Sequence, residues 1–107
     1  MKFVVMSDIH YISRRMMGEG TPEHVRMQPA VCEQALTQAS GIDGADVILL
    51  TGDLTDRGDR PSHEDLIALL RGLRAKGKRV FVTTATHDFN HHRAYQRQYG
   101  DTRASFK

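Results

Sequence analysis

Residues able to bind a metal ion or to transfer a proton occur in three groups along the chain. The groups are Asp8 with His10, Asp53 with Asp56, and His87 with Asp88. A carboxylate and an imidazole two residues apart can hold one cation. This combination suits zinc, iron or manganese better than calcium, which prefers oxygen ligands. An Asp-x-His pair by itself fits a loop Asp that caps a turn beside a surface His equally well.

The second group lies in a turn rich in Asp and Gly. Gly52 and Gly58 allow a sharp turn with the backbone close to a ligand. Asp53 is expected at the tip of a strand, where its carboxylate can bridge two cations. Arg57 can hold a phosphate through its two-pronged guanidinium group. The alternative is an ordinary turn between a strand and a helix, with Arg57 in solvent.

The third group pairs an imidazole with a neighbouring carboxylate. We expect His87 to act as a general acid, with Asp88 orienting its ring and raising its pKa. A surface His in a turn is the simpler alternative. His24 and His63 are expected to be exposed and structural.

Three short apolar runs are candidates for the strands that carry these groups. They cover Phe3 to Met6, Val47 to Leu50 and Val80 to Val82. None alternates cleanly with polar residues, which predicts parallel strands covered on both faces.

Helical patterns lie between these runs. The first has apolar residues on one helix face, at Val31, Cys32, Ala35, Leu36 and Ala39. Pro29 suits its first turn, and Cys32 is expected to be a small core residue.

A second apolar stripe predicts a second helix, formed by Leu66, Ile67, Leu69, Leu70 and Leu73. We expect Ser62 to cap its start and Gly77 to close its end. A weaker pattern predicts a third helix from about His91 to Tyr99, with His91 and His92 on the surface at its start.

The resulting order, β-α-β-α-β-α, predicts an α/β fold with a parallel sheet flanked by helices. Right-handed crossovers place the carboxyl ends of parallel strands at one edge, where ligands bind in open α/β sheets. The three chemical groups should therefore converge. A flavodoxin-like domain that binds one magnesium ion is a weaker alternative, because it needs five strands and the sequence indicates three.

Composition limits the classes of protein to be considered. The chain has 107 residues, which predicts a single domain over 1–107. Its formal net charge of +2 gives no indication of nucleic-acid binding. The only cysteine, Cys32, excludes an internal disulfide, and no apolar stretch has the length of a membrane span. We expect a cytoplasmic protein.

Together the three groups resemble the first motifs of the calcineurin-like metallophosphoesterase family. They read Asp8-Ile9-His10, then Gly52-Asp53-Leu54-Thr55-Asp56-Arg57-Gly58, and then Ala85-Thr86-His87-Asp88. The resemblance implies the N-terminal half of an α/β sandwich and a hydrolase of phosphate mono- or diesters that uses divalent cations such as Mn, Fe or Zn. It implies that Asp8 and His10 bind one metal ion and that Asp53 bridges to a second. His87 would then protonate the leaving oxygen, with support from Asp88 and Arg57. Two cations about 3.5–4 Å apart can clamp an in-line phosphoryl transfer.

The chain departs from the family pattern in two ways. Ala85 and Thr86 replace a Gly and a metal-binding Asn, so we expect the second metal ion to be held weakly through the shorter Thr86 side chain, held differently, or absent. The family's downstream Gly-His and Gly-His-x-His motifs do not occur between Asp88 and Lys107. We therefore expect a partial domain, with an apolar sheet face to be covered by a C-terminal half or a partner chain. The alternative function is a non-catalytic module that binds metal or phosphate.

Overall fold

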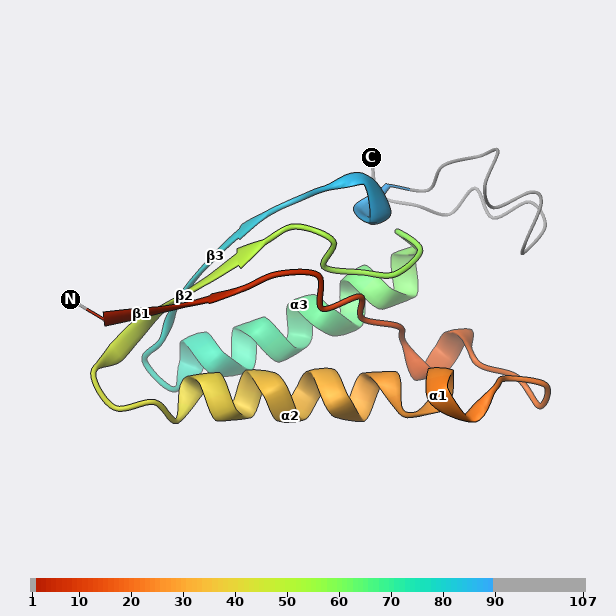
Figure 1. Cartoon of the computed structure of the whole chain (residues 1–107), viewed down its shortest axis with the longest axis horizontal. Helices are drawn as coiled ribbons and strands as arrows, with labels where there is room; N and C mark the ends of the chain where they lie inside the picture. The colour runs from red at the N-terminus through yellow and green to blue at the C-terminus, as the bar shows by residue number, and fades with distance from the viewer. Residues whose placement is uncertain (1, 90–107) are drawn as a thin grey trace.

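A computed structural model describes residues 2–89 as one three-stranded sheet with helices packed below it (Figure 1). The strands are β1 (Lys2–Met6), β2 (Ala45–Thr51) and β3 (Arg79–Thr83). The helices are α1 (Glu23–Arg26), α2 (Gln28–Ser40) and α3 (Arg60–Ala75), with short 3₁₀ turns η1 (Arg14–Met16) and η2 (Thr86–Asp88). The helix predicted from His91 to Tyr99 lies outside the described residues.

The sheet confirms the predicted parallel α/β topology. β2 lies in the centre and pairs in parallel with β1 on one side and β3 on the other, with Val4, Ile48 and Val80 in one row across the sheet. Each predicted strand is present and extends one or two residues beyond its apolar run. The carboxyl ends of all three strands consequently lie at the same edge.

The expectation that both sheet faces are covered is wrong for the part of the chain that the structure describes. α2 and α3 both lie under one face of the sheet (Figure 1). This follows from the strand order β1-β2-β3, because two right-handed crossovers in the same direction place both helices on the same side. On the other face, Phe3, Val5 and Phe81 are 57%, 54% and 50% exposed. This apolar face agrees with the expectation that further structure covers it.

The core lies between the sheet and the two long helices. Its buried centre includes Ile48 and Leu50 from β2, Leu36 from α2 and Leu66 from α3. Cys32 is buried there and donates its S–H to the Ile9 carbonyl at 3.1 Å. Burial raises the pKa of this thiol to about 11, which confirms Cys32 as a core residue.

The start of α3 differs from the expectation. The helix is capped by Asp59, whose carboxylate accepts hydrogen bonds from the backbone N–H of Ser62 at 2.8 Å and from its hydroxyl at 3.0 Å. Ser62 therefore lies inside the first turn, behind Pro61, which suits an early helical position. Gly77 closes the other end with a φ of 92°, as predicted.

Among residues 2–89, no helix has the length and apolar character needed to cross a membrane.

Candidate metal centre

The loops that follow the three strands converge at the carboxyl edge of the sheet, as the sequence predicts. The loop after β1 runs beside the loop after β2, and four backbone hydrogen bonds join them, one of them from the Asp56 N–H to the Tyr11 carbonyl at 3.1 Å. The N–H groups of Asp8, His10 and Tyr11 donate to the carbonyls of Gly52, Asp53 and Leu54 at 3.2, 3.0 and 2.9 Å. A parallel bridge between Tyr11 and Thr55 continues this pairing. The paired loops hold Asp8, His10 and Asp53 close to one another.

The backbone at this edge adopts an uncommon conformation. Asp8, His10 and Asp53 have φ angles of 54°, 48° and 47°, which place them in the left-handed region. A non-glycine residue in this region costs about 1–2 kcal/mol, although Asp and His tolerate it better than most. β1 ends at Met6, so Asp8 and His10 are not aligned by a continuing strand. Left-handed turns bring these side chains together instead.

One set of possible ligands surrounds the Nε2 atom of His10. This atom lies 3.7 Å from Asp8 Oδ1 and 3.8 Å from Asp53 Oδ2. The Ser7 hydroxyl donates to Asp8 and, as the main cause, holds the pKa of that carboxyl below its usual value. A ligand atom from each of the three residues lies within 4.8 Å of the other two. Two carboxylates and one imidazole form a donor set that fits a first-row divalent cation.

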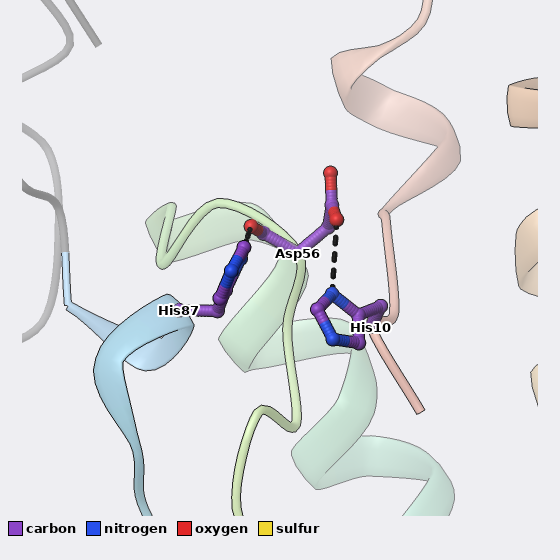
Figure 2. Close-up of side chains that lie close together, drawn as sticks. All are labelled: His10, Asp56 and His87. Atoms are coloured by element: carbon purple, nitrogen blue, oxygen red, sulfur yellow. Dashed lines mark hydrogen bonds and ion pairs between the residues drawn. The ribbon is translucent and has the colours of Figure 1, made fainter. Parts of the chain in front are cut away.

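Asp56 lies on the other edge of the His10 ring, between His10 and His87 (Figure 2). His10 Nδ1 is 3.1 Å from Asp56 Oδ1, and His87 Nδ1 is 2.8 Å from the Asp56 backbone carbonyl. Because both oxygens only accept, each ring donates from Nδ1, which leaves Nε2 as the nitrogen available to bind a metal ion or to carry a proton. The sequence placed Asp56 in the second chemical group but assigned it no role, although its place three residues after Asp53 in the same turn was a usable signal.

Asp88 has a different role from the one expected. It is only 1% exposed, and its carboxylate accepts hydrogen bonds from the backbone N–H of Thr55 at 2.8 Å and of Ala85 at 3.0 Å. The His87 ring is oriented by the Asp56 carbonyl and not by Asp88. His63, expected to be exposed, is half-buried and donates from Nε2 to the Asp88 carbonyl at 2.9 Å. Asp88 and His63 thus hold η2, the turn that carries His87.

The remaining predicted residues border the same edge. The backbone N–H of His87 donates to Asp53 Oδ1 at 3.0 Å. Arg57 is 19% exposed, with its Nε 3.5 Å from Asp56 Oδ2. Thr86 is exposed and begins η2.

The loops after β2 and β3 also touch at Gly52. This residue has a φ of 104°, and a Cβ atom there would lie 2.8 Å from the Cβ of Ala85. Both the conformation and the close approach require glycine at this position.

Comparisons with known proteins agree with the motif pattern. A family model described as calcineurin-like phosphoesterase matches residues 1–106. A probable cyclic nucleotide phosphodiesterase from Rhodopseudomonas palustris is 39% identical over 75 residues, which is 70% of this chain and 26% of that protein. The aligned part of the chain thus spans about a quarter of the relative's length.

Proposed function

The chain belongs to the calcineurin-like phosphoesterase family, and from this premise we propose that its sheet edge forms part of an active site for metal-dependent hydrolysis of phosphate mono- or diesters. The observation that carries the proposal is the meeting of Asp8, His10 and Asp53 from two separate loops within ligand distance of one another. The phosphodiesterase relative supports a phosphoester substrate.

Asp8, Asp53 and Nε2 of His10 are the proposed metal ligands. Asp56 supports this set, because its carboxylate accepts from Nδ1 and turns the lone pair of the ring toward Asp8 and Asp53. When bound, divalent cations such as Mn, Fe or Zn would supply Lewis-acid stabilisation and lower the pKa of water. Thr86 is the proposed weak ligand for a second ion, because its hydroxyl is shorter and binds less well than an amide carbonyl.

His87 is the proposed general acid. Its ring is exposed, and the Asp56 carbonyl holds its Nδ1–H, so Nε2 is the nitrogen that can carry a proton to the leaving oxygen. The hydrogen bond from the His87 backbone to Asp53 fixes η2 beside the metal ligands. Arg57 lies against Asp56 and is proposed to balance the charge of the phosphoryl group. Asp88 acts through the turn that it holds.

We propose further that residues 1–107 form one partial domain of a cytoplasmic enzyme, in which a C-terminal half or a partner chain covers the open sheet face. The exposure of Phe3, Val5 and Phe81 supports this view. A non-catalytic module that binds metal or phosphate is the second candidate. Thr86 in the place of the family's Asn favours it.

Hydrolysis of p-nitrophenyl phosphate and bis(p-nitrophenyl) phosphate by the full 107-residue chain with added Mn²⁺ tests the proposal. The Asp53→Asn variant should lose about 100-fold in rate, because a carboxylate that would hold the cation becomes a neutral amide. Asp43→Asn makes the same chemical change in an exposed loop at the opposite end of β2 and should leave the rate unchanged. Mn²⁺ binding that depends on Asp53 without turnover would favour the module. A chain that shows no Mn²⁺ binding and no turnover would exclude both candidates.

A further inference from the structure

A second set of possible ligands lies on the Nδ1 edge of His10, opposite the set just described. It consists of His10, Asp56 and His87, one residue from the loop after each strand (Figure 2). One ligand atom from each lies within 4.8 Å of the other two, and the two imidazole rings meet edge to face with centroids 4.6 Å apart. Two imidazoles and one carboxylate form a typical ligand set for zinc.

The spacing of the donors is compatible with a single zinc ion. Two ligands bound tetrahedrally at about 2.0–2.1 Å from zinc lie roughly 3.3 Å apart, and His10 Nδ1 and Asp56 Oδ1 are separated by 3.1 Å. Arg57 lies against the other carboxylate oxygen of Asp56, which leaves Oδ1 as the ligand atom. The exposed ring of His87 has room to rotate onto the ion, and the solvent side can supply a fourth ligand.

The two sets cannot both use His10 as a neutral ligand, since a neutral imidazole has one lone pair. When Nε2 is the ligand, Nδ1–H donates to Asp56. When Nδ1 is the ligand, Nε2–H faces Asp8 and Asp53 at 3.7 and 3.8 Å. In each case a carboxylate lies beside the nitrogen that does not bind metal, which is the usual means of orienting a metal-binding histidine. The tautomer of one ring therefore selects between two cation sites.

We propose that His10 Nδ1, Asp56 and His87 form an alternative zinc site that competes with the set of Asp8, His10 Nε2 and Asp53. Its functional consequence rests on the proposed function: zinc in this site occupies His87, so that excess zinc inhibits hydrolysis. The binding itself does not depend on any activity.

Zinc binding to the full chain with Asp8→Asn and Asp53→Asn combined tests the proposal. These changes remove both carboxylates of the first set. Asn tolerates the left-handed backbone, and its side-chain carbonyl can still accept the hydrogen bond from the His87 backbone. Titration calorimetry with Zn²⁺ should show one site in this variant. Co²⁺ in place of zinc should give the visible absorption of a tetrahedral nitrogen and oxygen shell.

Adding Asp56→Asn or His87→Gln to this background should weaken Zn²⁺ binding at least about tenfold and abolish the Co²⁺ spectrum. The matched controls Asp43→Asn and His24→Gln change the same side-chain types at exposed positions elsewhere and should have no effect. Loss of all binding in the double variant, or binding that does not respond to Asp56→Asn and His87→Gln, would overturn the proposal. Circular dichroism checks that each variant folds. Because the readout is binding, a failure to hydrolyse phosphoesters leaves the result intact.

Discussion

The two ends of the sheet turn the chain in different ways. At the amino end, the positive φ angles before β2 and β3 belong to glycines, Gly44 at 76° and Gly77 at 92°. At the carboxyl end, three of the residues with positive φ are Asp8, His10 and Asp53. Glycine adopts this conformation without a steric penalty, whereas a residue with a Cβ atom adopts it at a steric cost. The fold therefore accepts backbone strain at the edge where it presents chemical groups, and avoids it at the two amino-end turns.

The strained carboxyl edge is held by contacts from several parts of the chain. Hydrogen bonds between the loop backbones hold the loops after β1 and β2 together. The Asp88 carboxylate and the Cys32 thiol add hydrogen bonds to the backbone of these loops. At the amino end, Lys78 donates to the Ala45 carbonyl at 2.9 Å. Substitution of the chemical groups at the carboxyl end should consequently change cation binding, whereas substitution at the amino-end turns should change stability without changing binding.

The largest expected effect is on cation binding. Asp8→Ala should lower the affinity of the chain for Mn²⁺ about 100-fold or more, because it removes one of two carboxylates from the first ligand set. Gly77→Ala, at the amino end, should leave that affinity unchanged. Titration calorimetry of both variants measures the contrast. Equal losses in the two variants would mean that binding follows overall stability and not the chemistry of the edge.

An effect of similar size is expected for the reactivity of Cys32. Burial raises the pKa of this thiol from 9.0 to about 11, so the thiolate fraction at pH 8 falls about 100-fold relative to the unfolded chain. A disulfide reagent should therefore label the native chain at least about 100-fold more slowly than the chain in concentrated urea. Cys32 contacts the carbonyl of Ile9, between Asp8 and His10. Fast labelling that does not depend on urea would show that this loop opens locally.

A smaller effect is expected at Thr86, where the family carries an amide ligand. Thr86→Asn should strengthen the binding of a second Mn²⁺ about tenfold, because an amide carbonyl reaches further and binds better than a hydroxyl. The stoichiometry is read from calorimetric titration or from metal analysis after dialysis. Thr37→Asn on the exposed side of α2 is the matched control. Two tightly bound ions in the unchanged chain would contradict the expectation of weak second-site occupancy.

The sequence predicted the strands and the convergence of their loops, because apolar runs and crossover handedness determine both. It did not predict how the side chains pair within the loops. His87 and Asp88 are neighbours in the chain, yet the turn buries the Asp88 carboxylate against the Thr55 backbone. The His87 ring instead forms a hydrogen bond with the backbone carbonyl of Asp56, 31 residues earlier. Such long-range pairs depend on backbone conformations, such as those at Asp8 and His10, that local residue preferences do not specify.

The same reasoning explains two other differences from expectation. Asp59 and Ser62 are both good helix caps, and Asp59 is the cap here because its carboxylate accepts from the backbone N–H and the hydroxyl of Ser62. Continuous apolar runs in β1 and β3 predicted two covered faces, and the described chain supplies helices for one. An apolar run shows that a strand can be buried on both sides, but it does not specify what buries it.

The smallest expected effect concerns stability. Asp8→Ala and Asp8→Gly both delete the carboxylate, so both should lose the same cation affinity. They should differ in free energy of unfolding, because alanine carries a Cβ into a φ of 54° and glycine does not. The glycine variant should be about 1 kcal/mol more stable. Gly77→Ala, with a φ of 92°, should lose about the same amount.

Urea denaturation followed by circular dichroism measures all three variants without added metal. Gly72→Ala in the last turn of α3 is the control of opposite sign, since helical alanine is about 0.5–1 kcal/mol more stable than glycine. If Asp8→Gly proved no more stable than Asp8→Ala, the carboxyl edge would carry no strain at that residue. The contrast between the two ends of the sheet would then reduce to a difference in chemistry alone.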